Sequence, residues 1–132
     1  MYASSSYVAR HGAPATPADL AEHACVTFLM PSSGRALPWL FAGGVSIKPA
    51  ARFRCSEDVL GVITLARAGV GLIQVFDFLV AEDVARGTLV EVLAGHRGHS
   101  HGFTLIYPKL IKPTPPVRAF IDFVVSQARS AA

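Results

Sequence analysis

The stretch from residue 56 to residue 91 constrains the fold most, because its pattern alternates between helix and buried strand. Apolar residues recur at helical spacing between positions 59 and 66, and Gly69 follows where the end of a helix favours positive φ. Residues 72–76 then form an apolar run, interrupted only by Gln74, whose length suits a central strand. A β-α-β-α-β order predicts an α/β sheet whose ligands bind where strands end and helices begin.

Polar residues and glycine mark the ends of the two helices expected in this stretch. Ser56 is placed to cap the first helix, where Glu57 and Asp58 suit the positive end of the helix dipole. Asp77 is placed to cap the second helix, and Gly87 is placed to end it. Each helix is therefore expected to begin at a polar N-cap.

The remaining elements are expected from turn and capping signals. Residues 4–6 are placed to cap a short helix that His11-Gly12 would end, and Thr16 is placed to cap the next helix. Thr16-Pro17 and Thr114-Pro115 each place a proline directly after a capping residue, which favours the start of a helix. The pair Gly43-Gly44 lies between two short apolar runs, which predicts a hairpin. The expected helices cover residues 7–10, 18–22 and 115 onward, and the other expected strands cover residues 25–29, 39–42, 45–48, 51–55, 89–93 and 103–107.

The composition favours one folded domain. Of the 132 residues, 52% are hydrophobic and 16% are charged, which favours a packed core over disorder. The formal net charge is +3, but the basic residues are scattered, which disfavours a local nucleic-acid patch. No apolar stretch reaches the roughly 20 residues that span a bilayer, and the N-terminal residues do not resemble a secretory signal. We therefore expect a cytoplasmic chain that binds neither a membrane nor DNA directly.

No motif of a catalytic or cofactor site stands out. Gly69-Val70-Gly71 lacks the third glycine of a dinucleotide fingerprint and precedes a strand rather than a helix. The hydrolase motif G-x-S-x-G is absent, and adjacent acids such as Glu82 and Asp83 do not face each other on a helix. We expect no enzymatic activity and no cofactor.

The histidines and cysteines raise two further possibilities. His96, His99 and His101 lie in a glycine-rich loop where three imidazoles suit zinc or nickel, but a solvated loop is the simpler explanation and no metal site is predicted. Cys25 and Cys55 are expected in strands, as buried thiols rather than as a disulfide.

Residues 68–93, AGVGLIQVFDFLVAEDVARGTLVEVL, resemble the second lobe of the effector-binding domain of LysR-type transcriptional regulators. No single motif is unique, but further segments match the same lobe in the same order. These are residues 3–12, 16–25, 33–39, 107–108 and 115–123, so the resemblance covers nearly the whole chain.

The resemblance implies a Rossmann-like lobe of the type II periplasmic-binding-protein fold, truncated to one lobe plus the C-terminal helix. Residues 1–112 are expected to form the lobe, and residues 113–132 the helix that in the family returns to the first lobe. The implied function is that of a ligand-sensing fragment without the family's DNA-binding helix-turn-helix. The alternatives are one lobe of a transport-type solute-binding protein and an interaction module that senses nothing.

The resemblance also places a small-molecule effector between two lobes, against strand ends and helix starts. Ser56, with the backbone N–H groups that follow it, suits a carboxylate such as that of an organic acid. The family usually has proline where Phe76 stands, which leaves the hinge geometry open. This chain is expected to form only one wall of that site and therefore to bind the effector weakly. The implied wall residues are Phe28, Leu29, Ser56, Gln74 and Phe76.

The last helix carries an apolar stripe at positions i, i+3, i+4 and i+7. Each such side chain contributes ~1.5–3 kcal/mol when it is buried. In the family this helix packs on the first lobe, so we expect a homo-oligomer formed through the stripe, a helix repacked on its own lobe, or a partner chain. The stripe consists of Val117, Phe120, Ile121 and Val124.

Overall fold

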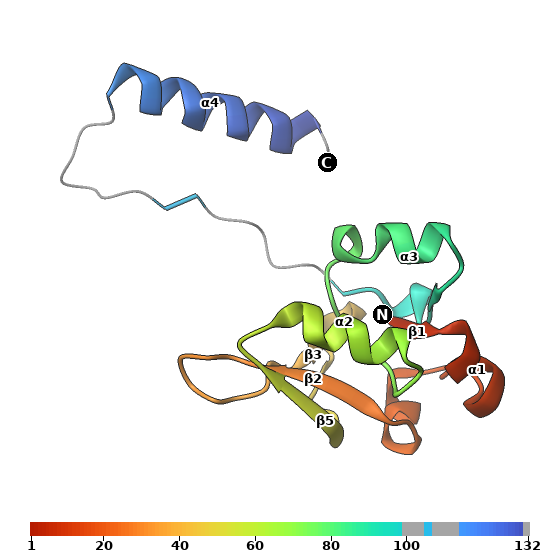
Figure 1. Cartoon of the computed structure of the whole chain (residues 1–132). Coiled ribbons are helices and arrows are strands. Elements are labelled where there is room, and N and C mark those ends of the chain that lie inside the picture. Colours follow the sequence, from red (N-terminus) through yellow and green to blue (C-terminus); the bar gives the residue numbers. More distant parts are fainter. Residues whose placement is uncertain (99–104, 107–113, 131–132) are drawn as a thin grey trace. The chain divides into compact units, whose positions relative to one another are not determined.

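The computed structural model describes residues 1–98, 105–106 and 114–130 (Figure 1). The chain divides into two units, residues 1–100 and residues 101–132, and each is described by itself. The strands of the first unit are β1 (Tyr2–Ser4), β2 (Cys25–Leu29), β3 (Trp39–Leu40), β4 (Ser46–Ile47), β5 (Ala51–Ser56) and β6 (Leu89–Glu91). Its α-helices are α1 (Ser5–His11), α2 (Val59–Arg67) and α3 (Ala81–Ala85), and short 3₁₀ helices lie at Pro17–Glu22, Ala42–Gly44, Asp77–Leu79 and Ala94–His96.

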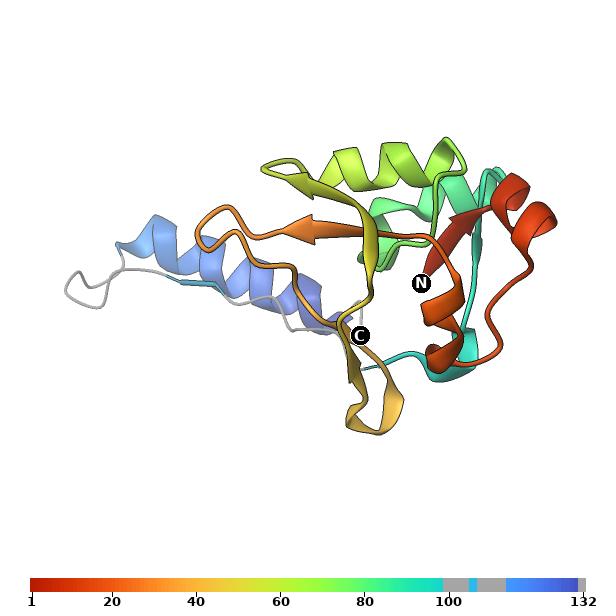
Figure 2. The same cartoon turned by 90° about the horizontal axis from the view of Figure 1, so that it is seen from below.

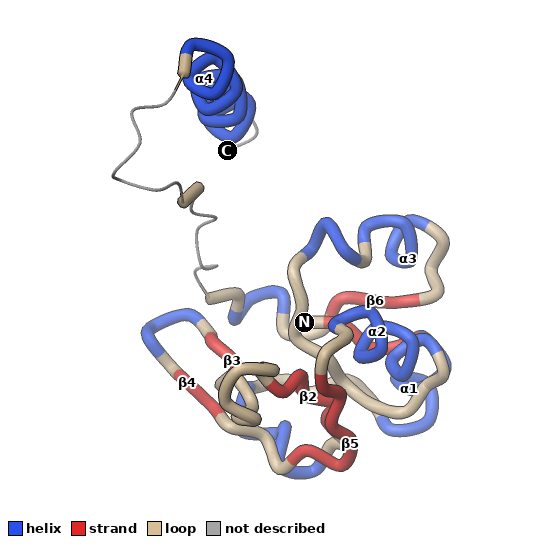
Figure 3. The backbone as a smooth tube through the Cα atoms, turned by 60° about the vertical axis from the view of Figure 1, so that its left-hand side comes forward, coloured by secondary structure: helices blue, strands red, loops and turns tan. Residues whose placement is uncertain are grey.

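The strand pairs join into one mixed layer through residues 72 and 73. β2 and β5 are parallel, and β1 and β6 are antiparallel. Figure 3 shows β2 and β5 side by side. Leu72 exchanges backbone hydrogen bonds with the start of β2, and Ile73 exchanges them with Tyr2 of β1, all at 2.8–2.9 Å. The order across the layer is therefore β5, β2, residues 72–73, β1 and β6. The predicted central strand is confirmed in its place, but its pairing ends at Ile73 rather than at residue 76.

Two apolar clusters cover the two faces of this layer, because neighbouring residues of a strand point to opposite faces. Val26, Ile73 and Leu89 pack with the buried face of α2. Cys25 and Leu72 pack in the other cluster, which includes Trp39 of the β3–β4 hairpin. Figure 2 shows this arrangement, with α2 in lime green on one side of β2 and the hairpin on the other.

Several capping signals act as the sequence predicts. The hydroxyl of Ser4 accepts a hydrogen bond from the backbone N–H of Tyr7 at 3.0 Å, and Gly12 ends α1 with φ of 76°. Thr16 precedes a 3₁₀ helix whose Asp19 carboxylate accepts a hydrogen bond from the backbone of Thr16 at 2.9 Å. The β3–β4 hairpin turns through a short 3₁₀ helix at Ala42–Gly44, which includes the predicted Gly-Gly pair.

Two of the predicted caps are wrong. The N-cap of α2 is Asp58, whose carboxylate accepts a hydrogen bond from the backbone N–H of Leu60 at 2.8 Å, and not Ser56. Asp77 does not cap a helix, because Phe76 holds that position and the Asp77 carboxylate binds the hydroxyl of Tyr2. In each case a second residue near the helix start supplies the cap position.

The second unit contributes α4 (Pro115–Ser130), which begins at the predicted proline. The backbone N–H of Arg118 donates to the carbonyl of Thr114 at 2.9 Å in its first turn. The strand predicted at residues 103–107 lies mainly outside the described residues, and Leu105 and Ile106 are not in a strand. Within the described residues, no helix is long and apolar enough to cross a membrane.

Candidate functional site

The predicted wall residues of β2 and β5 lie at one edge of the layer, where these two parallel strands end. Leu29 and Ser56 are paired residues at the ends of β2 and β5, and Phe28 is paired with Cys55. Phe28 and Leu29 are half-buried, whereas Ser56 is exposed. The structure therefore brings the first three predicted wall residues together on neighbouring strands.

Gln74 follows the central segment at this same edge. Its side-chain oxygen accepts a hydrogen bond from the backbone N–H of Leu40, and its side-chain nitrogen donates to the carbonyl of Leu40, both at 2.9 Å. The one polar residue of the apolar run therefore attaches the β3–β4 hairpin to the end of the central segment.

Phe76 lies two residues beyond Gln74 and is 40% exposed. Its ring stacks on that of Phe78, with 5.6 Å between centroids and an angle of 17° between planes. The backbone at Phe76 has φ of −67°, a value that proline also adopts. The backbone at this position is therefore compatible with the proline that the resemblance implies here.

The start of α2 differs from the expected anion site. Glu57 adopts a positive φ of 69°, and the N–H of Asp58 donates to the carbonyl of Ser56 at 2.8 Å. The carboxylate of Asp58 itself occupies the cap position, so the helix N-terminus already has a negative partner. A ligand at this edge would therefore bind the hydroxyl of Ser56 rather than the backbone N–H groups at the start of α2, where the Asp58 carboxylate already lies.

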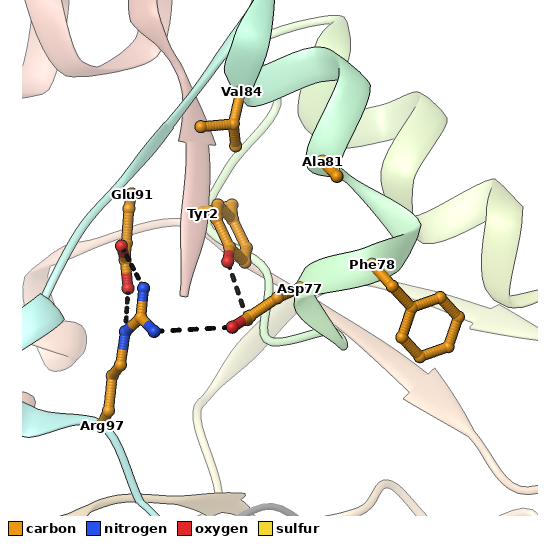
Figure 4. A pocket seen from close by; sticks show the side chains of 7 residues that line it. All are labelled: Tyr2, Asp77, Phe78, Ala81, Val84, Glu91 and Arg97. Atoms are coloured by element: carbon orange, nitrogen blue, oxygen red, sulfur yellow. Dashed lines mark hydrogen bonds and ion pairs between the residues drawn. The ribbon is translucent and has the colours of Figure 1, made fainter. Parts of the chain in front are cut away.

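An ion-pair cluster that the sequence analysis did not find lines a pocket of about 470 Å³ at the same edge, where β1 begins and β6 ends (Figure 4). The hydroxyl of Tyr2 donates to Asp77 at 2.8 Å. Arg97 binds Glu91 through two hydrogen bonds, of 2.5 and 2.6 Å, and lies 3.5 Å from the second oxygen of Asp77. The apolar part of the lining comes from Phe78, Ala81 and Val84.

Two groups of this cluster, Glu91 and Tyr2, have pKa values shifted from their ordinary values. The hydrogen bonds from Arg97 hold the pKa of Glu91 below its usual range. Burial, and then the hydrogen bond to Asp77, raises the pKa of Tyr2. Two carboxylates surround one guanidinium, so an anionic ligand would have to displace a carboxylate to reach Arg97.

The cysteines and histidines form neither a disulfide nor a group of metal ligands in the part of the chain that the structure describes. Cys25 is buried and Cys55 is half-buried, and both are free thiols, as predicted. Burial raises the pKa of Cys25 to about 11. Of the histidine loop, only His96 is described, because His99 and His101 lie outside the described residues. No group of three possible metal ligands occurs among the residues described.

Comparison with known proteins gives one consistent family. A family model described as the LysR substrate binding domain matches residues 1–129. The HTH-type transcriptional regulator CrgA of Neisseria meningitidis serogroup B is 32% identical over 126 residues, which cover 95% of this chain and 42% of the relative. The uncharacterized HTH-type regulator YcaN of Escherichia coli is 32% identical over 122 residues, which cover 92% of this chain and 40% of the relative. The chain thus spans less than half the length of these curated relatives.

Solved structures agree with the sequence matches. The regulatory domain of CrgA superimposes with a TM-score of 0.76 at 32% identity, covering 96% of this chain and 62% of that structure. The regulatory domain of AphB from Vibrio vulnificus, at 23% identity and a TM-score of 0.64, supports the fold alone. These regulatory domains have the type II periplasmic-binding-protein-like α/β fold, so the predicted fold class is confirmed.

Proposed function

The chain belongs to the LysR substrate-binding domain family, and on that premise we propose that the sheet edge at Leu29, Ser56 and Gln74 is its wall of an effector site. The observation that carries this proposal is the register of the parallel strands, which pairs Leu29 with Ser56 at their ends. Ligands of open α/β sheets bind beyond the carboxyl ends of the strands.

The chemistry of this edge suits a small organic acid with an apolar body. Phe28 and Leu29 are half-buried and Phe76 is exposed, so each has apolar surface that a ligand is able to cover. The hydroxyl of Ser56 supplies a hydrogen-bond partner beside that surface. The carboxylate of Asp58 at the start of α2 disfavours an anion there, so we expect the affinity for an organic acid to be low.

In a whole regulator, the ligand would act by differential affinity for two arrangements of the domain. The relatives reported above are named transcriptional regulators, which favours sensing over a transport-type lobe and over catalysis. We assign no direct DNA contact to these residues and place the protein in the cytoplasm.

A thermal-shift screen of the full chain with aromatic and dicarboxylic acids tests the effector site. Ligands at millimolar concentration are expected to raise the melting temperature, because they bind the folded state only. Ser56→Ala should reduce that shift, and Ser32→Ala, an exposed loop change, should leave it unchanged. An equal shift in wild type and both variants would contradict the role of Ser56, and no shift with any acid would contradict the site.

The apolar stripe on α4 supports self-association as a second part of the proposal. Phe120 is 59% exposed, and Val117 is exposed one turn earlier, while Ile121 and Val124 are half-buried. Light scattering should detect an oligomer that Phe120→Glu weakens and that Ser126→Glu, on the same helix, leaves intact. A wild-type monomer at every concentration tested would contradict this part.

A further inference from the structure

A second pocket, of about 360 Å³, lies at the opposite edge of the sheet from the proposed effector wall. β2 and β5 are parallel, so their starts lie together at this edge, just as their ends lie together at the other. The pocket is lined by residues beside the starts of β2 and β5, together with the end of α1 and the turn after α2. The pocket therefore belongs to the first unit alone and is distinct from the effector wall.

Arg10 is held in a fixed position at this pocket. Its Nε donates to the carbonyl of Ser6 at 3.2 Å, and its Nη2 donates to the carbonyl of Gly69 at 3.0 Å. Both acceptors are backbone carbonyls, which fix the guanidinium without bringing a carboxylate to it. A cation ordered before binding loses less conformational entropy when an anion arrives.

Arg52 adds a second positive charge from the start of β5. Within the part of the chain that the structure describes, neither Arg10 nor Arg52 forms an ion pair with a carboxylate. Glu22 is exposed and is the acidic residue of the lining. The lining therefore holds two guanidinium groups and one carboxylate, which leaves an excess of positive charge.

Aromatic rings supply the apolar part of the lining. Tyr7 is only 2% exposed, and the ring of His11 lies 4.6 Å from it, centroid to centroid. The Tyr7 hydroxyl accepts a hydrogen bond from the backbone N–H of Ala24 at 3.0 Å. Phe53 is 40% exposed, and the guanidinium carbon of Arg52 lies over its ring, 6.0 Å from the centroid. The exposed part of the ring offers surface to a planar ligand beside that cation.

We propose that this pocket, formed by Arg10, Arg52, His11 and Phe53, is a second ligand site that binds an aromatic carboxylate. The guanidinium groups match the geometry of a carboxylate, and the rings match the planar body of the ligand. The site rests on residues other than those of the effector wall, so each of the two sites is testable without the other.

Titration of the full chain with benzoate, followed by amide NMR, tests this site, and neutral benzamide at the same concentrations is the ligand control. Benzoate is expected to shift the signals of residues 10–11, 22–24 and 52–53, and benzamide to shift them much less. Arg52→Gln should weaken benzoate binding at these residues about fivefold, the change that corresponds to ~1 kcal/mol for an exposed ion pair. Glu22→Gln should strengthen binding, because it removes the negative charge from the lining.

Arg54→Gln is the matched control, because Arg54 lies on the same strand, is exposed and does not line the pocket. It should leave benzoate affinity at these residues unchanged. Equal weakening by Arg52→Gln and Arg54→Gln, or equal shifts by benzamide and benzoate, would overturn the second site. Signals of residues 28–29, 56 and 74–76 report the effector wall separately, so failure of one site is distinguishable from failure of the other.

Discussion

The side-chain amide of Gln74 binds both backbone groups of Leu40, with two hydrogen bonds of 2.9 Å. Leu40 lies in β3, thirty-four residues earlier in the chain, so this pair fixes the hairpin against the end of the central segment. The arrangement explains why a polar residue interrupts an apolar run at this position.

Gln74→Ala should therefore release the hairpin from the sheet edge. The backbone N–H and carbonyl of Leu40 would both lose a partner, so we expect a loss of about 1–3 kcal/mol in the free energy of unfolding. Urea unfolding measures the loss, and amide hydrogen exchange at Leu40 locates it. Gln127→Ala, an exposed change on α4, is the control, and equal losses in the two variants would contradict the role of Gln74.

Gly69→Ala should destabilise the chain more than Gly87→Ala, although both glycines have a positive φ near 70°. That backbone conformation alone costs an alanine about 1–2 kcal/mol. A Cβ at Gly69 would also lie 2.9 Å from Nη2 of Arg10, whereas at Gly87 nothing lies within 4 Å. Thermal unfolding of the two variants compares them directly, and a loss for Gly69→Ala no greater than that for Gly87→Ala would contradict a penalty from the contact with Arg10.

Asp83 should stabilise the fold near neutral pH and lose that effect in acid. Its carboxylate, in a side chain 11% exposed, accepts hydrogen bonds of 2.8 and 2.7 Å from Arg67, which hold its pKa below the ordinary value of 3.8. A lowered pKa gives stability that is present above the ordinary value and is lost as pH falls through the lower, folded value. The stability difference between wild type and Asp83→Asn should therefore shrink below pH 3.8.

The neighbouring pair of Glu82 and Arg86 provides a matched control for that measurement. Both side chains are exposed, Glu82 in α3 and Arg86 at its C-cap, so Glu82→Gln should change the free energy of unfolding by less than about 0.5 kcal/mol. Denaturant unfolding at a series of pH values gives both differences. A wild-type advantage over Asp83→Asn that grows in acid would contradict the assigned pair.

The two thiols should react at different rates in the folded chain. Cys25 has no exposed surface, and its pKa is raised to about 11, so it holds almost no thiolate at neutral pH. Cys55 is half-buried, and burial raises its pKa as well, but a reagent is able to reach it. Iodoacetamide should label Cys55 slowly in native protein and Cys25 only in denaturant. Rapid native labelling in Cys55→Ser would contradict the burial of Cys25.

Local signals predicted much of the fold, because they act within a few residues. Ser4 and Gly12 bound α1 as expected, and β2 covers residues 25–29 as predicted. The cap of α2 was missed because Ser56 and Asp58 are both good capping residues, and the positive φ of Glu57 decides between them. The sequence pattern does not predict this positive φ at a glutamate.

Contacts between distant segments were the part that sequence could not predict. Tyr2 and Asp77 are seventy-five residues apart, and the hydrogen bond between them exists only because the sheet order brings β1 beside residues 72–73. Arg97 joins the cluster from a loop that has no periodic pattern. The parallel order of β2 and β5, in contrast, was predictable from the sequence. It places Phe28, Leu29 and Ser56 at the same edge of the layer, as expected.

The most direct measurement for the effector wall is amide NMR of the full chain with each acid that raises its melting temperature. We expect the largest shifts at residues 28–29, 56–58 and 74–76, where the parallel segments end. Shifts that leave these residues unchanged at saturating ligand, while other parts of the chain respond, would contradict the proposed effector wall.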